Sequence, residues 1–129
     1  MQLLSTLSLV AGLASAVQAN ECKMNRFSSG NEWTVTASGV RDIPGTCGGL
    51  WDNLKRWPVA CLVGYGTQYC REEGPGQLKW YFATTDLCNE GHVESAWWHA
   101  TRNRFGDIQC KDCSPGFGDG SCPRLEHYP

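Results

Sequence analysis

The stretch Gln77-Leu78-Lys79-Trp80-Tyr81-Phe82-Ala83 is the strongest indication of the fold, because every second side chain from Leu78 to Phe82 is large and apolar. Such alternation is typical of a strand with one buried face. A β-branched apolar stretch at 59–65 precedes it, and Gly74-Pro75-Gly76 between the two predicts a turn. We therefore expect 59–65 and 77–83 to form an antiparallel hairpin with a long loop.

Upstream of this hairpin, the sequence predicts a strand and then a helix. The segment 32–38 alternates apolar and polar side chains, which favours a strand, and residues 42–45 favour a turn. We expect Thr46 to cap a helix over 47–57, in which apolar residues recur at intervals of four and three. Pro58 ends this helix, since proline disfavours the helical conformation in the residue before it.

Downstream of the hairpin, the sequence predicts a second helix and a short closing strand. The helix opens at Asn89 or Gly91, and apolar residues recur at helical spacing over 93–100. We expect Gly106 to end it in the left-handed conformation that glycine tolerates best. Residues 107–110 follow as the closing strand.

These elements give the order β-α-β-β-α-β. We therefore predict an α+β fold of the ferredoxin-like type, a two-layer sandwich with two helices on one face of four antiparallel strands. We expect residues 20–129 to form one disulfide-rich α/β domain with an irregular tail from about residue 111.

The start of the chain resembles a secretion signal. Residues 3–16 are apolar and uncharged but too short to span a bilayer comfortably. Val17-Gln18-Ala19 fits the small-x-small pattern of a cleavage site, and Ala14-Ser15-Ala16 is an alternative. We therefore expect 1–19 to be a signal peptide and the protein to be extracellular, with the apoplast of a host as one such location.

Composition restricts the partners. The 129 residues carry a net charge of −2, with 19% of them charged. Nucleic-acid binders need clustered positive charge to neutralise phosphates, so we expect no nucleic-acid partner. No second apolar stretch is long enough to span a membrane, so we expect no membrane span. We also expect the protein to be a monomer.

Eight cysteines, all of them after residue 19, indicate structural disulfides in a small secreted protein. The cysteines are Cys22, Cys47, Cys61, Cys70, Cys88, Cys110, Cys113 and Cys122. Metal or redox chemistry is the alternative, since Cys110 and Cys113 form a CxxC motif. A zinc site would need a second such pair or paired histidines, which the sequence lacks. We expect no cofactor and no metal.

The predicted topology restricts the disulfide pairing. It places the start of the first helix and the end of the 59–65 strand at the same end of the sheet, so we predict a Cys47–Cys70 bond. Cys22, Cys61, Cys88 and Cys110 should lie toward the opposite end. Bonded cysteines need Cα atoms within about 7 Å, which disfavours pairs between the two ends.

The six tryptophans supply the candidate binding residues. Trp33, Trp57, Trp80 and Trp97 fall on faces that we expect to be buried. Trp98 lies outside the apolar stripe of the second helix, in a second stripe with Arg102 and Phe105, and Trp51 lies off the apolar face of the first helix. We therefore name Trp98, Trp51, Arg102 and Phe105 as candidate binding residues.

A catalytic site is harder to assemble. His92, Glu94 and His99 lie within eight residues, and histidine with a carboxylate can cleave RNA by general acid–base catalysis. On a helix, however, Glu94 points about 200° away from His92. We therefore expect no catalytic residues and no enzymatic activity.

The leader, the cysteine framework and the β-α-β-β-α-β order resemble small secreted cysteine-rich fungal proteins. Among these, the pattern over 22–110 resembles the α/β-sandwich killer toxins of smut fungi and the effector-like proteins that share their fold. The segments Cys47-Gly48-Gly49-Leu50-Trp51-Asp52-Asn53-Leu54 and Val93-Glu94-Ser95-Ala96-Trp97-Trp98 are similar to sequences of secreted fungal proteins. The resemblance carries no functional residue over.

The resemblance implies a secreted toxin or effector, related to virulence, that binds a host or competitor macromolecule without catalysis. The tryptophans support an alternative, a module that binds carbohydrate such as cell-wall glycan. A third hypothesis is a small secreted ribonuclease, which would need a cleft that joins a histidine to a carboxylate and an arginine. Fold alone does not choose among them.

Overall fold

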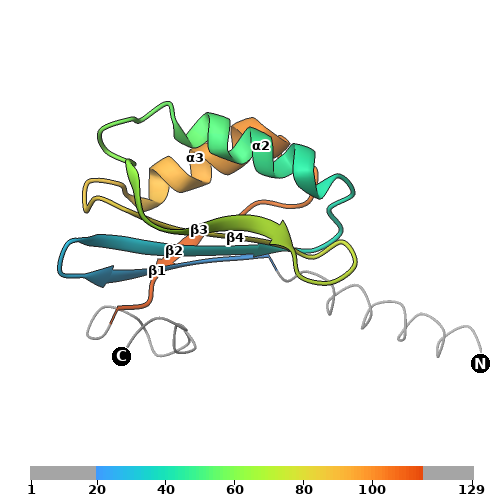
Figure 1. The fold of residues 1–129 in the computed structure, drawn as a ribbon. Coiled ribbons are helices and arrows are strands. Elements are labelled where there is room, and N and C mark those ends of the chain that lie inside the picture. The colour runs from blue at the N-terminus through green and yellow to red at the C-terminus, as the bar shows by residue number, and fades with distance from the viewer. Residues whose placement is uncertain (1–19, 115–129) are drawn as a thin grey trace, which may run out of the picture.

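Two helices lie side by side over one face of a five-stranded sheet (Figure 1). The computed structural model describes residues 20–114, so the predicted leader, 1–19, and residues 115–129 lie outside the described part. The elements are β1 (Glu21–Phe27), β2 (Gly30–Ala37), α2 (Ile43–Leu54), β3 (Val63–Glu72), β4 (Leu78–Thr84), α3 (Glu90–Thr101) and β5 (Cys110–Asp112). The predicted α+β two-layer class is confirmed.

The order of the strands differs from the ferredoxin-like order that we predicted. The sheet runs β3-β4-β2-β1-β5, with β5 parallel to β1 and every other pair antiparallel. A ferredoxin-like sheet would set the closing strand, β5, directly beside β2. Here β1, which the sequence analysis missed, lies between them, so the β-α-β-β-α-β prediction is wrong at this edge.

Strand β1 forms a hairpin with β2 across Ser28 and Ser29. Cys22 and Met24 are buried, whereas Glu21 is exposed and Lys23 half-buried. The alternation ends at Met24, because Asn25 is also buried and Phe27 is exposed. The segment therefore lacks the regular run of large apolar side chains that marks β4. The local pattern of β1 is weak, and pairing with the adjacent strand β2 along its whole length makes it a strand.

Both helices begin at side-chain caps. The side chain of Asp42 accepts a hydrogen bond from the Gly45 N–H at 3.1 Å, so α2 starts one turn earlier than predicted and Thr46 is not its cap. Pro44 fits this first turn because its missing N–H has no partner to lose there. Of the two predicted starts of α3, Asn89 and Gly91, the structure has Asn89 as the cap, through the His92 N–H at 3.1 Å.

Helix α3 ends earlier than predicted. Arg102 adopts the left-handed conformation with φ of 53°, and Asn103 follows with φ of 57°. Thr101 supports this turn, since its hydroxyl donates to the Trp97 carbonyl and accepts from the Asn103 N–H. Gly106, with φ of 96°, lies beyond the helix end and is not its cap.

The β3–β4 hairpin departs from regular pairing at one place. Residues 58–61 form turns rather than the predicted strand, and β3 begins at Val63. Gly64 pairs with Ala83 and Tyr69 pairs with Tyr81, so the four residues 65–68 of β3 lie opposite Phe82 alone. Such a bulge interrupts the ladder and bends the strand away from its partner.

Three tryptophans form the centre of the core between sheet and helices. Trp33, Trp80 and Trp97 are fully buried, as predicted. The indole N–H of Trp33 donates to the Thr84 hydroxyl at 3.0 Å, and that of Trp97 donates to the Gly106 carbonyl at 2.8 Å. Trp57 is only half-buried, because it lies past the end of α2.

Three disulfides connect described cysteines, Cys22–Cys110, Cys47–Cys70 and Cys61–Cys88, and no cysteine of residues 20–114 is free. The predicted Cys47–Cys70 pair is confirmed, with Cα atoms 5.7 Å apart. Cys113 is also disulfide-bonded, and Cys122 lies outside the described residues.

The predicted separation of the cysteines by sheet ends is only partly right. Cys110, Cys22, Val35, Trp80 and Cys70 form one row across the sheet in the pairing register. The Cys22–Cys110 bond therefore lies level with Cys70 and not at the opposite end. The added strand β1 is the reason, since it brings Cys22 to β5 within the sheet.

The start of the predicted irregular tail is ordered. Residues 111 and 112 belong to β5, the Cys113 N–H donates to the Met24 carbonyl at 2.7 Å, and the Ser114 hydroxyl accepts from the Arg26 N–H at 2.7 Å. No helix within residues 20–114 is long and apolar enough to cross a membrane.

Candidate binding pocket

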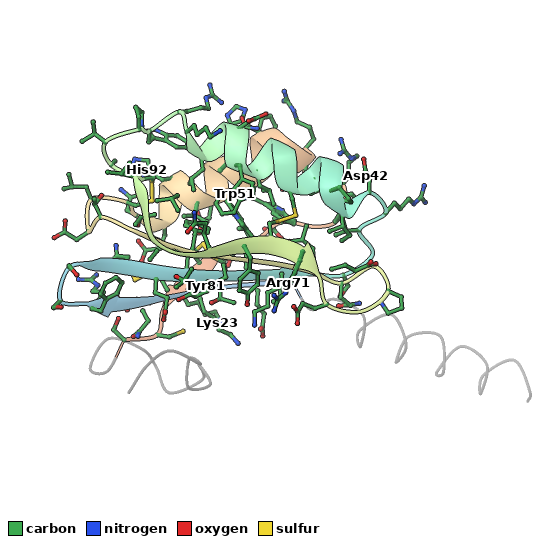
Figure 2. The ribbon with its side chains drawn as sticks, viewed as in Figure 1. Lys23, Asp42, Trp51, Arg71, Tyr81 and His92 are labelled. Atoms are coloured by element: carbon green, nitrogen blue, oxygen red, sulfur yellow. A yellow bond between two sulfur atoms is a disulfide. The ribbon has the colours of Figure 1, made fainter. Side chains whose placement is uncertain are left out.

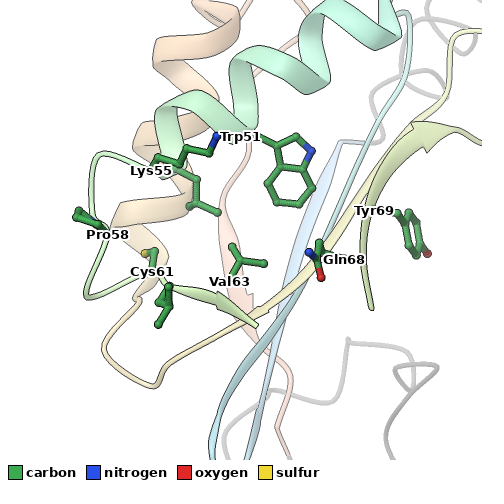
Figure 3. A pocket seen from close by; sticks show the side chains of 9 residues that line it. Trp51, Lys55, Pro58, Cys61, Val63, Gln68 and Tyr69 are labelled. Atoms are coloured by element: carbon green, nitrogen blue, oxygen red, sulfur yellow. The ribbon is translucent and has the colours of Figure 1, made fainter. Parts of the chain in front are cut away.

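A pocket of about 550 Å³ opens between the C-terminal end of α2, the loop that follows it and the bulged part of β3 (Figure 3). Its size is within the range of about 300–1,000 Å³ that is usual for small-molecule sites. The lining is largely apolar and includes Trp51, Leu54, Lys55, Leu62, Val63 and Gln68.

The bulge in β3 explains why this pocket exists. Residues 65–68 leave the regular ladder opposite Phe82, and Gln68 of this bulge lines the pocket. The loop over 58–62 forms the other side, and the Cys61–Cys88 disulfide fixes it to the residue that precedes the Asn89 cap of α3. The pocket therefore lies between segments that a backbone irregularity and a disulfide hold apart.

Trp51 forms the inner wall. Its indole is half-buried and contacts Trp80 and Phe82 edge-to-face, with ring centroids 5.7 and 5.9 Å away. Figure 2 shows Trp51 between α2 and the sheet. The candidate Trp51 thus lies in a concave site, with one side packed on the core and the other available to a ligand.

The sequence analysis missed the other pocket residues. Leu62 is 59% exposed, an unusual exposure for leucine. The predicted strand 59–65 includes it, but β3 begins only at Val63. Lys55 and Gln68 belong to no sequence motif that would predict a binding role. The run 59–63, apolar but directly after a proline, was the available signal for an exposed apolar loop.

The other candidate binding residues lie elsewhere. Trp98 is 42% exposed on α3, and the guanidinium of Arg102 lies 4.4 Å from the centroid of its ring. Phe105 is half-buried and borders a separate, more polar pocket of about 590 Å³ beside Arg41 and Arg104. Trp98 and Arg102 are therefore brought together, but Phe105 and Trp51 belong to two other sites.

His92, Glu94 and His99 do not form a catalytic group. His92 Nδ1 accepts from the Asn89 N–H at 3.0 Å in the capping box of α3. A carboxylate oxygen of Glu94 accepts from the Cys110 N–H at 2.8 Å, and His99 lies against the edge of Trp98. Each side chain has a separate structural contact.

One group of residues has the composition of a metal site. The ligand atoms of Cys61, Cys88 and His92 lie within 4.8 Å of one another. The two sulfurs are bonded to each other, so neither is a thiolate that could bind a metal. The CxxC motif is also excluded as a thiol pair, because Cys110 is bonded to Cys22.

The sheet face opposite the helices carries aromatic and charged side chains, among them Tyr81 and Arg71 (Figure 2). The Tyr81 hydroxyl donates to the buried Glu32 carboxylate, and the Arg71 guanidinium lies 4.0 Å from the centre of the Tyr69 ring. Arg71 is also paired with Glu73. These groups are engaged with one another, which leaves the pocket beside Trp51 as the strongest candidate site.

Comparison with protein-family models and with curated protein sequences gives no match.

Proposed function

We propose that this protein is a secreted effector or killer-toxin-like protein that acts by binding a host or competitor molecule, and that it catalyses no reaction. The pocket beside Trp51 is the binding site. It receives an apolar group of the bound molecule between the indole of Trp51 and the loop that carries Leu62. The observation that carries this proposal is the pocket itself, an apolar hollow in the described surface.

The energetics of the pocket support binding. Leu62 is a large apolar side chain that is mostly in contact with water, and burial of apolar area contributes roughly 25 cal/mol per Å². The walls are held by the core contacts of Trp51 and by the Cys61–Cys88 bond. A wall that is fixed before binding loses little conformational freedom when a ligand enters, which favours affinity.

The disulfides support an extracellular role. Bonds of this kind persist in oxidising compartments and are rare in the cytosol. Together with the leader-like 1–19 segment and the resemblance described above, they favour a secreted effector or toxin over an intracellular enzyme.

The two alternatives have weaker support. A sugar-binding tryptophan needs a free ring face, and Arg102 covers part of the exposed Trp98 ring. A ribonuclease needs acid and base groups within hydrogen-bond reach of one substrate, whereas His92, Glu94 and His99 have separate contacts.

The test uses two leucines of similar exposure. Leu62, 59% exposed, lines the pocket, and Leu87, 62% exposed, does not. Leu62→Asp should abolish binding of the neutral apolar fluorophore N-phenyl-1-naphthylamine and the effect of the oxidised protein on host tissue or competing fungal cells. Leu87→Asp should change neither. Both variants should keep the native near-ultraviolet circular dichroism.

Two results would contradict the proposal. One is a Leu62→Asp protein that keeps full fluorophore binding and full biological effect. The other is hydrolysis of RNA by the native protein that His92→Ala or His99→Ala abolishes, because it would establish the ribonuclease alternative.

A further inference from the structure

One of the described residues that line the pocket beside Trp51 is charged, and we propose that this group, the ammonium of Lys55, selects a small hydrophobic carboxylic acid as ligand. This inference rests on the proposed function, because it names the class of molecule that the same pocket binds. The ligand is an apolar body with one carboxylate, the body against Trp51 and the carboxylate at Lys55.

Charge complementarity is the first argument. Among the described residues of the lining, Lys55 alone carries a charge at neutral pH, and none of them is a carboxylate. None of the ion pairs among the described residues involves Lys55. Figure 3 shows its side chain along the pocket, with its nitrogen end toward Trp51. A ligand carboxylate would therefore meet an ammonium group that has no protein carboxylate to displace.

The position of Lys55 on α2 is the second argument. Lys55 is the C-terminal cap residue of the helix, and its backbone N–H donates to the Trp51 carbonyl at 3.1 Å. The last carbonyls of a helix carry partial negative charge, which disfavours an anion nearby. The pocket without the Lys55 ammonium should therefore repel a carboxylate, so the preference for an acid depends on this one side chain.

The apolar walls are the third argument. Trp51, Leu54 and Val63 offer ring and aliphatic surface but few hydrogen-bond donors or acceptors. A strongly hydrated ligand such as an oligosaccharide or a phosphate ester would lose its water contacts there without replacement, which is costly. Gln68 and Tyr69 add an amide and a phenol hydroxyl to the lining, and either group can donate a hydrogen bond.

The test compares two ligands that differ only in charge, 1-naphthylacetate and 1-naphthylacetamide, by isothermal titration with the oxidised protein. The native protein should bind the acid about fivefold more tightly than the amide, the upper range for a solvent-accessible ion pair. High salt should reduce the affinity for the acid and leave that for the amide unchanged.

Three variants locate the preference. Lys55→Gln should bind the amide as the native protein does and should bind the acid more weakly than the amide, because only the helix carbonyls then act on the charge. Lys55→Arg should keep the preference. Arg56→Gln is the matched control, since Arg56 is the adjacent exposed cation and does not line the pocket. It should leave both affinities unchanged.

The outcomes separate this inference from the proposed function. Equal affinity for acid and amide, or a preference that survives Lys55→Gln, would overturn the inference while fluorophore binding keeps the pocket as a site. A preference lost in Arg56→Gln and kept in Lys55→Gln would also overturn it. If acid, amide and N-phenyl-1-naphthylamine all fail to bind, the pocket itself is not the functional site and both proposals fall.

Discussion

Removal of the Cys22–Cys110 disulfide should destabilise the protein more than removal of Cys47–Cys70. In the chain-entropy model, a disulfide stabilises the fold by restricting the unfolded chain, and the effect grows with the length of the closed loop. The two bonds close loops with sequence separations of 88 and 23 residues.

In that model, the Cys22–Cys110 bond stabilises the fold by about 4.6 kcal/mol at 25 °C and the Cys47–Cys70 bond by about 3.4 kcal/mol. The two pairs are well matched otherwise, because each joins one buried cysteine, Cys22 or Cys47, to one half-buried cysteine, Cys110 or Cys70. The cost of cavities left by alanine should therefore cancel to a large extent. The expected difference between the two double-alanine variants is about 1.2 kcal/mol.

The assay is urea unfolding of both variants, followed by near-ultraviolet circular dichroism under conditions that keep the other disulfides oxidised. If the Cys22→Ala/Cys110→Ala protein is unfolded without urea, both variants are compared in sulfate, which strengthens apolar burial. A Cys47→Ala/Cys70→Ala protein that is equally or less stable would refute the reasoning. It would mean that β5 separates from β1 before the rest of the fold unfolds.

Three further results are expected. Gly30→Ala should lower the melting temperature strongly in a thermal scan, because a Cβ there would lie 2.0 Å from the Thr84 carbonyl oxygen. Gly64→Ala is the control and should change the melting temperature little, because a Cβ there meets no atom within 4 Å. Glu94→Ala should lower the free energy of unfolding by about 1–3 kcal/mol and speed hydrogen exchange at the Cys110 amide, because that N–H loses its acceptor. Glu94→Gln keeps an acceptor and should lower the free energy of unfolding less. Equal exchange rates in the two variants would contradict this prediction. An alkylating reagent should label no thiol of the unfolded protein before reduction and eight thiols after it. A labelled thiol before reduction would support the metal or redox alternative.

Local sequence signals were reliable where one segment carried its own pattern. The alternation over 77–83 predicted β4 to within one residue, and the Asn89 cap with the apolar stripe over 93–100 predicted α3. The predicted topology places the start of the first helix and the end of the 59–65 strand at one end of the sheet, which predicts the Cys47–Cys70 pair. In each case the side chains that decide the structure are close in sequence or lie in regular elements.

The candidate site was harder to predict from the sequence than the regular elements. The position of Trp51 off the apolar face of its helix predicts a binding residue, and Trp51 does line the pocket. The same helical geometry predicts Trp98 and Phe105 as binding residues, yet they lie in two other places. Helical position predicts whether a side chain leaves the core, but it does not tell which other segment that side chain meets.

Local sequence patterns were enough to predict the α+β class, the Cys47–Cys70 bond and the buried faces of α2, β2, β4 and α3, because period, caps and proline act within a few residues. The insertion of β1 between β2 and β5 and the bulge over 65–68 beside the pocket depend on tertiary contacts. Strand order depends on hydrogen bonds between segments distant in sequence, such as β1 and β5, and residue period carries no record of these partners. The pocket exists because a bulge, a loop and a disulfide from three parts of the chain meet beside Trp51.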